Sequence, residues 1–184
     1  MNKFYIYLFI ALMFSSCKDD KSKTDKTAID SIDAEINGND GPDFFALTMN
    51  AVVEKDDNLT LFYLEEGQDK ISKKNSISIP VKGSENFQTL TFKIDKDILP
   101  TRLILKFGNE EKYQKMVFDE TLISYEGREI LIAKEKFFWN FNPNKFIDYD
   151  RTNFTAIVTE KDGVFNPFFV SRKTLEDRID LELP

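Results

Sequence analysis

The chain has 184 residues and a formal net charge of −7; 41% of its residues are hydrophobic and 18 are phenylalanine. This apolar content is enough for the core of one ordinary domain and excludes a chain that is disordered throughout, while the acidic balance without a basic stripe excludes nucleic acid as a partner. Because the sequence has no histidine and one cysteine, it lacks the commonest general base, an intramolecular disulfide and a thiolate zinc site, and we expect no metal and no cofactor.

The first predicted element is a cleaved export signal over residues 1–16. A short start that carries Lys3 is followed by an apolar run from Phe4 to Phe14. This run is shorter than the roughly 20 residues that a transmembrane helix needs, and it has the length of a secretory signal core. We therefore expect residues 1–16 to be removed and the rest of the chain to be exported.

The residues after this run, Ser15, Ser16 and Cys17, resemble the lipobox of bacterial lipoproteins. The resemblance implies that Cys17 is lipidated, becomes the first mature residue, and holds the protein on the outer membrane through acyl chains such as palmitate. Phe14 departs from the family pattern, which usually has an aliphatic residue at that position. The alternative is cleavage by an ordinary signal peptidase, which would leave Cys17 as a free thiol.

The tripeptide Lys18-Asp19-Asp20 resembles the short acidic surface-export signal of Bacteroidetes lipoproteins, which implies exposure on the cell surface. The alternative is the solvated start of a linker. Up to Pro42 the composition is dominated by Lys, Asp, Ser, Thr, Asn and Gly, which is typical of a flexible tether. We expect residues 17–42 to connect the lipid anchor to one folded domain, residues 43–184.

Residues 43–184 show the period-two alternation of half-buried strands, as where Ile77, Ile79 and Val81 share one face. The pattern predicts strands at 44–54, 59–64, 76–81, 88–94, 102–107, 116–125, 129–133, 153–159 and 165–170. Turn residues separate them, and Asp162-Gly163 is the sharpest hairpin signal. We expect an all-β fold, a single β-sandwich of the jelly-roll kind. The only helical candidate in this region is Ser171–Arg178, which we expect to be a short terminal turn or tail.

The stretch from Leu59 to Tyr125 resembles β-sandwich segments of Bacteroidetes envelope proteins and, through them, the galactose-binding-like sandwiches of carbohydrate modules. The resembling segments are Asp57–Tyr63, Val81–Ser84, Leu99–Leu103 and Phe107-Gly108. They cover about half of the mature chain, and they are structural rather than catalytic. The resemblance therefore implies the architecture more than an activity.

Two aromatic segments, 137–143 and 165–169, contain the candidate binding site. Exposed rings flanked by Asn amides can stack on a sugar while the amides bond its hydroxyls, and the two segments would form a shallow groove if they converged. The candidate ligand-binding residues are Phe138, Trp139, Asn140, Asn142, Asn166 and Phe168, with Arg102, Arg128 and Arg151 as possible contacts to an acidic or hydroxylated ligand. The alternative, favoured because rings are more often buried than displayed, is that they fill one end of the sandwich.

No catalytic motif is evident, and carboxylate pairs such as Asp119-Glu120 or Asp148 and Asp150 are expected by chance among 32 acidic residues. The sequence therefore predicts a non-catalytic outer-envelope lipoprotein whose sandwich binds glycan or another envelope ligand. The alternatives are a structural or accessory lipoprotein that binds a protein partner of the outer membrane, and a glycosidase with an acid pair. An exposed Trp139 with polar neighbours favours the first hypothesis, a broad apolar patch the second, and a cleft with two perturbed carboxylates the third.

Overall fold

The computed structural model describes residues 44–184, apart from residue 96 and residues 108–112. The predicted export signal, Cys17 and the linker 17–42 lie outside the described residues. Within the described part of the chain, no helix combines the length and the apolar character that crossing a bilayer requires.

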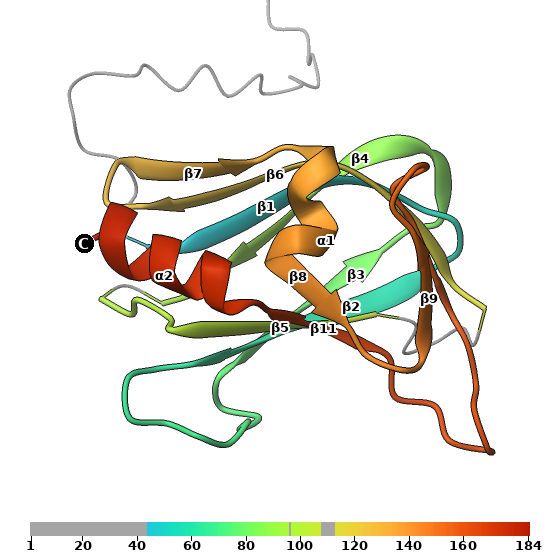
Figure 1. Ribbon diagram of the computed structural model, residues 1–184, viewed down its shortest axis with the longest axis horizontal. Coiled ribbons are helices and arrows are strands. Elements are labelled where there is room, and N and C mark those ends of the chain that lie inside the picture. Colours follow the sequence, from blue (N-terminus) through green and yellow to red (C-terminus); the bar gives the residue numbers. More distant parts are fainter. Residues whose placement is uncertain (1–43, 96, 108–112) are drawn as a thin grey trace, which may run out of the picture. The chain divides into compact units, whose positions relative to one another are not determined.

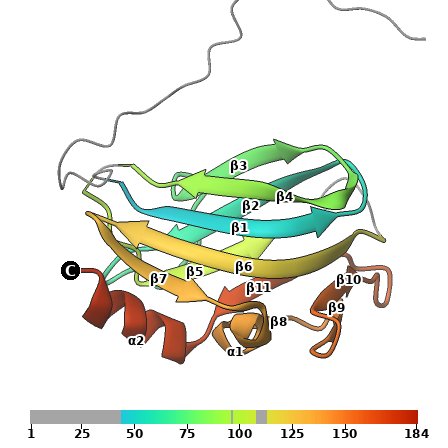
Figure 2. The ribbon, with the colours of Figure 1, turned by 90° about the horizontal axis from the view of Figure 1, so that it is seen from above.

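Two antiparallel β-sheets face each other as a sandwich (Figure 1 and Figure 2). One sheet has the order β4-β1-β6-β10-β9, with β7 also paired to β6, and the other has the order β3-β2-β5-β11-β8. The strands are β1 (Ala46–Val53), β2 (Asp57–Leu64), β3 (Ser76–Val81), β4 (Ser84–Lys93), β5 (Arg102–Lys106), β6 (Lys115–Tyr125), β7 (Arg128–Ile132), β8 (Phe141–Pro143), β9 (Ile147–Asp150), β10 (Thr155–Val158) and β11 (Phe168–Ser171). The helical elements are η1 (Lys134–Lys136), α1 (Phe137–Asn140) and α2 (Lys173–Glu182). The prediction of an all-β sandwich is confirmed.

The first four strands form a hairpin that is folded across the two sheets. Strand β2 pairs with β3 in one sheet, and β1 pairs with β4 in the other. Strand β5 then lies beside β2 and β6 beside β1, so the chain changes sheet at each connection from β3 to β6. This winding is of the jelly-roll kind. The β6–β7 hairpin departs from it, because both of its strands stay in one sheet.

Strand β6 shares one of its edges between two partners. Its start pairs with β10 through Lys115–Val117, and its end pairs with β7 through Thr121–Tyr125, while β1 occupies the opposite edge. After β7 the chain leaves this sheet through η1 and α1, and it enters the other sheet as β8. Helix α1 is therefore the crossover between the sheets, and it brings the first aromatic segment against β6.

Alternating burial along the strands follows the predicted pattern. In β1 every second residue from Leu47 to Val53 is fully buried, and in β2 Leu59, Leu61 and Tyr63 are buried as predicted. Burial of such side chains supplies the main stabilising free energy, about 25 cal/mol per Å² of apolar surface. The largest fully buried side chains include Phe45, Phe92, Phe107, Phe118, Phe137, Phe138, Phe141 and Phe169.

Helix α2 is part of the core, so the prediction of a short turn or tail at 171–178 is wrong. Leu175, Ile179 and Leu183 are buried, and their spacing of four residues puts them on one helical face. Both helices lie along one side of the sandwich, and β3 and β4 lie along the opposite side (Figure 2). The apolar stripe of α2 therefore packs against this side of the sandwich, which the sequence pattern alone did not predict.

Two predicted turns adopt the conformation that hairpins favour. Glu126 and Gly127 have φ values of 47° and 78°, and Asp162 and Gly163 have values of 55° and 71°, as type I′ turns require. The second turn is closed only by an isolated bridge between Lys161 and Val164, so β10 and β11 are shorter than predicted. Strands β8 and β9 are not predicted by the sequence pattern, because they are short and interrupted by turn residues.

Candidate ligand-binding surface

The fold brings the two aromatic segments together, because β8 pairs with β11. The partners are Phe141 with Ser171, Asn142 with Val170, and Pro143 with Phe169. The two segments therefore lie side by side, as a shared groove would require, but most of their rings are buried in the core. Their burial agrees with the alternative interpretation for the phenylalanines, in which these rings fill the sandwich.

Phe137 is the centre of this buried ring cluster. Its ring stacks on Phe118 of β6 with centroids 3.9 Å apart, and it lies 5.0 Å from Phe141 and 5.5 Å from Phe169. The fully buried Phe138 meets it edge to face at 5.4 Å. Such edge and offset contacts add about 0.5–1.5 kcal/mol per pair beyond the burial of apolar area. The burial of Phe137 and Phe138 thereby fixes the backbone position of the next residue, Trp139.

Trp139 is the exception in the segment, because 56% of its side chain surface is exposed. The guanidinium of Arg151 lies over the indole at 4.8 Å from the ring centroid, and it also lies 5.5 Å from the ring centroid of Tyr149. Tyr149 is itself 41% exposed and rests on the buried ring of Phe138 at 5.0 Å. We call Trp139, Tyr149 and Arg151 the Trp139 platform.

Arg151 is held in place by the turn that follows β9. The carboxylate of Asp150 accepts hydrogen bonds from the backbone N–H of Thr152 at 2.7 Å and of Asn153 at 3.3 Å, and from the Asn153 side-chain amide at 2.7 Å. These bonds, led by the one from Thr152, lower the pKa of Asp150 below its ordinary value. The turn is thus closed by a charged acceptor, and it presents Arg151 to the two rings.

The other predicted site residues do not join this platform. Asn140 is buried, and its amide donates to the Lys136 carbonyl at 2.8 Å, which closes α1. Asn142 is exposed and accepts from Arg172 at 2.6 Å. Asn166 and Phe168 both contact Asn144 through their backbone. The Asn166 carbonyl accepts from the Asn144 side-chain amide at 2.7 Å, and the Phe168 carbonyl accepts from the Asn144 backbone N–H at 3.0 Å. No hydrogen bond or ring contact among the described residues links these four to Trp139.

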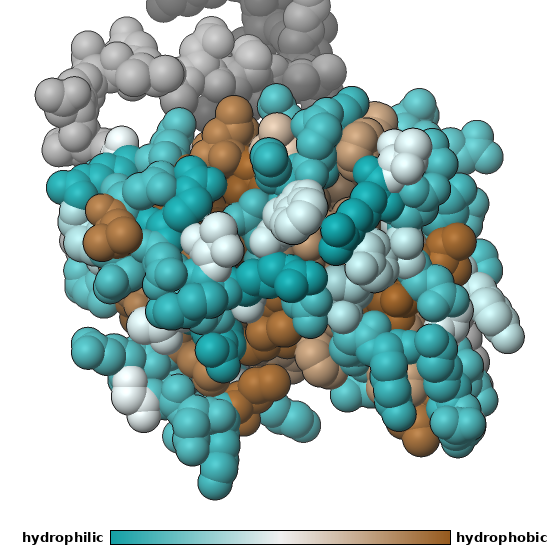
Figure 3. Space-filling model, in the orientation of Figure 1, coloured by the Kyte–Doolittle hydropathy of each residue, from teal (hydrophilic) through white to brown (hydrophobic). Residues whose placement is uncertain are grey.

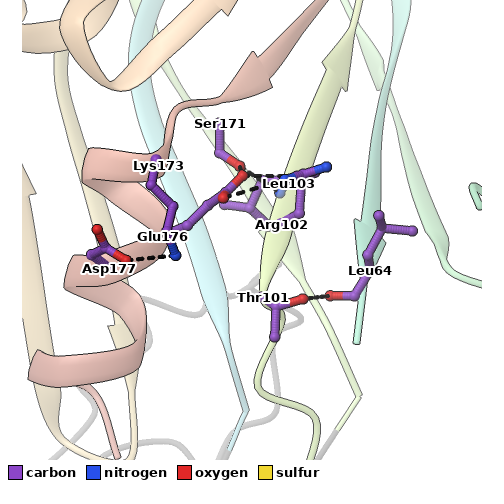
Figure 4. Close-up of polar contacts among 8 residues, drawn as sticks. All are labelled: Leu64, Thr101, Arg102, Leu103, Ser171, Lys173, Glu176 and Asp177. Carbon is purple, nitrogen blue, oxygen red and sulfur yellow. Dashed lines mark hydrogen bonds and ion pairs between the residues drawn. The ribbon is translucent and has the colours of Figure 1, made fainter. Parts of the chain in front are cut away.

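A cavity of about 590 Å³ beside α2 is a feature that the sequence did not indicate. Its lining residues come from the end of β2 and the loop after it, from the start of β5 and the segment before it, and from α2: Leu64, Glu66, Gln68, Asp69, Leu99, Pro100, Thr101, Arg102, Lys173, Glu176, Ile179 and Asp180. One wall is built by Arg102, whose Nε donates to Glu176 at 2.8 Å, while the Ser171 hydroxyl donates to the same carboxylate at 3.0 Å (Figure 4). The hydrogen bond to Glu176 raises the pKa of Arg102. No sequence motif marks this wall, since its partners lie far apart along the chain.

The carboxylates considered for acid–base chemistry have other partners. Asp119 accepts from the Asn50 amide at 3.1 Å, and Asp148 forms an ion pair with Lys161 at 3.5 Å. The lowered pKa of Asp150 is opposite in direction to that of a carboxyl that must stay protonated to act as an acid. Within the described ranges no group of three or more metal-binding side chains occurs.

The face that carries α1 and α2 is mostly hydrophilic, and its apolar residues form small separate patches (Figure 3). It therefore offers no broad apolar area of the kind that favours a protein partner. Comparison of the chain with models of known protein families, with curated proteins and with solved structures found no match.

Proposed function

We propose that the sandwich is a non-catalytic glycan-binding module of an envelope lipoprotein that is anchored through Cys17. The observation that carries the proposal is the exposure of Trp139 in a segment that buries Phe137, Phe138 and Phe141. Leaving a large ring in water forgoes about 25 cal/mol for each Å² of apolar surface that burial would remove. A ring kept at the surface next to a positioned arginine is a feature that a ligand can use.

The geometry of the Trp139 platform suits a sugar ring. A pyranose has an apolar face that can stack on an exposed indole, and its hydroxyls need hydrogen-bond partners at the rim. The guanidinium of Arg151 supplies N–H donors, and the Tyr149 hydroxyl lies 3.4 Å from one of its nitrogens. Because Phe138 supports Tyr149 from below, ligand binding requires little reordering of the platform.

The predicted lipid anchor at Cys17 would determine where in the cell envelope this module lies. Acylation of Cys17 and a polar linker over 17–42 would hold the module on the outer membrane, and the Lys18-Asp19-Asp20 signal would place it on the cell surface. A glycan-binding module at that position meets extracellular or envelope polysaccharides. The alternative of an accessory lipoprotein with a protein partner becomes the outcome if no glycan is bound.

A glycan array tests the proposal, with residues 17–184 carrying Cys17→Ser as the soluble protein. We expect binding that Trp139→Ala abolishes, because the stacking surface is removed. The matched control is Phe87→Ala, since Phe87 is 51% exposed on β4, which lies at the opposite end of the same sheet from β9. An array without binding, or binding that Trp139→Ala leaves intact, would contradict the proposal.

A further inference from the structure

We propose that the ligand of the Trp139 platform is a short anionic oligosaccharide, whose uronic acid carboxylate pairs with Arg151. This inference rests on the proposed function, and it names the class of glycan that the same surface binds. It follows from the state of Arg151, from the charges around the platform and from the turn that holds the guanidinium in place.

Within the described part of the chain, Arg151 has aromatic contacts but no acidic partner. Among the residues that the structure describes, no ion pair joins its guanidinium to a carboxylate, and its one side-chain hydrogen bond, to the Tyr149 hydroxyl, is 3.4 Å long. The contacts with the rings of Trp139 and Tyr149 supply no hydrogen-bond acceptor for the guanidinium N–H groups. Apart from the N–H directed at the Tyr149 hydroxyl, the guanidinium therefore has N–H donors without an acceptor among the described residues, and these can bind the two oxygens of a carboxylate.

The charges around the platform favour an anion, although the whole chain is acidic. Lys134 lies over the ring of Phe154, with its Nζ 5.4 Å from the centroid, at the far end of the turn that presents Arg151. Of the two acids of β9, Asp148 is paired with Lys161 and Asp150 accepts three hydrogen bonds within the turn. Among the described residues, Lys134 and Arg151 thus have ring contacts but no ion pair, whereas both acids of β9 have partners.

The net charge of −7 limits the size of the anion. A long polyanion would extend beyond the platform over an acidic surface, whereas a sugar with one or two carboxylates engages only the local charges. Charges farther away than about 8 Å are largely screened at physiological ionic strength. The same net charge that excludes nucleic acid is therefore compatible with a short acidic glycan.

The turn also reduces the cost of binding. Free arginine side chains lose rotamer freedom when they bind a ligand, at about 0.5–1.5 kcal/mol for each immobilised side chain. Arg151 has already lost much of this freedom, because two rings hold its guanidinium and the hydrogen bonds of Asp150 hold its backbone. A carboxylate can then bind without ordering the arginine first.

The test compares a short oligogalacturonate with its methyl ester, which has the same sugar backbone without the charges. Trp139 is the only tryptophan of the chain, so its fluorescence reports directly on the platform. We expect the acid to bind about ten- to hundredfold more tightly than the ester, as the loss of a charge-assisted contact implies. Arg151→Gln should bring both affinities to the level of the ester, and added salt should weaken binding of the acid alone.

The control is Lys82→Gln, which removes an exposed cation between β3 and β4, on the side of the sandwich opposite to the helices, and should preserve the preference for the acid. Equal affinities of the wild-type protein for acid and ester would overturn this inference and leave the glycan-binding proposal standing. Preference for the acid that survives Arg151→Gln would also overturn it, because another cation would then be responsible. Binding of neither ligand, together with a blank glycan array, would overturn the proposed function itself.

Discussion

Arg102 at the start of β5 and Glu176 of α2 form a two-point contact across 74 positions of the sequence, with Nε–Oε1 and Nη2–Oε2 distances of 2.8 and 3.4 Å (Figure 4). The Ser171 hydroxyl donates to the same carboxylate and accepts from the backbone N–H of Leu103. Helix α2 is thereby hydrogen-bonded to the start of β5. Glu176 is largely buried, while half of the Arg102 side chain is exposed. Loss of the contact would therefore be less compensated by water at the carboxylate than at the guanidinium.

We expect Glu176→Ala to lower the free energy of unfolding by about 1–3 kcal/mol, because the Ser171 hydroxyl and the guanidinium lose their common acceptor. Urea unfolding measures this change. The matched control is Glu182→Ala in the same helix, which removes an exposed ion pair with Arg178 and should cost about 0.5 kcal/mol or less. Equal losses in the two variants would show that the contact between Arg102 and Glu176 has no special importance.

Two neighbouring rings should differ sharply in their contribution to stability. Phe137→Ala removes a fully buried ring that contacts Phe118, Phe141 and Phe169, and it should lower the free energy of unfolding by about 3–5 kcal/mol. Trp139→Ala removes an exposed ring and its contact with Arg151, so we expect a loss of about 1 kcal/mol or less. Chemical denaturation of both variants gives the comparison, and a large loss in Trp139→Ala would contradict the surface position of this ring.

The platform should depend on pH through Asp150. Its pKa is lowered in the folded protein, mainly by the hydrogen bond from the Thr152 N–H. The contribution of a group of this kind is fully present above the ordinary Asp pKa of about 3.9 and is lost as the pH falls through the lowered value. We therefore expect Trp139 fluorescence to be constant down to about pH 4 and to change below it, as the turn loosens and Arg151 leaves the rings.

The variant Asp150→Asn separates this transition from general acid unfolding. Asparagine keeps an acceptor for the Thr152 N–H but does not titrate, so the acid change in fluorescence should disappear. Asp162→Asn, at the tip of the neighbouring hairpin, serves as the control and should retain it. An unchanged transition in Asp150→Asn would assign the effect to another carboxylate.

The predicted lipid anchor depends on a single atom, the sulfur of Cys17. When the full chain is produced in a bacterium with lipoprotein processing, we expect the protein to incorporate labelled palmitate and to partition into detergent. The variant Cys17→Ser should incorporate no label and partition into water. A wild-type protein that behaves like this variant would show that the leader is removed by an ordinary signal peptidase.

Several properties of this protein could be predicted from its sequence because they depend on local patterns. The alternation of apolar residues predicted the strands from 44–54 to 129–133 and the faces that they bury, and Glu126-Gly127 and Asp162-Gly163 predicted two turns. Strands β8 and β9 escaped prediction, because three or four residues interrupted by turn residues carry too little periodicity. The sandwich as a whole followed from the number of strands and the lack of long helices.

The state of each aromatic ring was decided only by the tertiary structure. The sequence pattern over 137–143 does not tell which rings are exposed. In the folded chain α1 buries Phe137 and Phe138 and leaves Trp139 exposed, and Phe141 is buried in β8. The partner of Trp139 comes from a different hairpin, and the partner of Glu176 comes from a strand 74 positions earlier in the chain. Strand identity depends on neighbours a few positions away, whereas exposure and pairing depend on which surfaces the folded chain brings together.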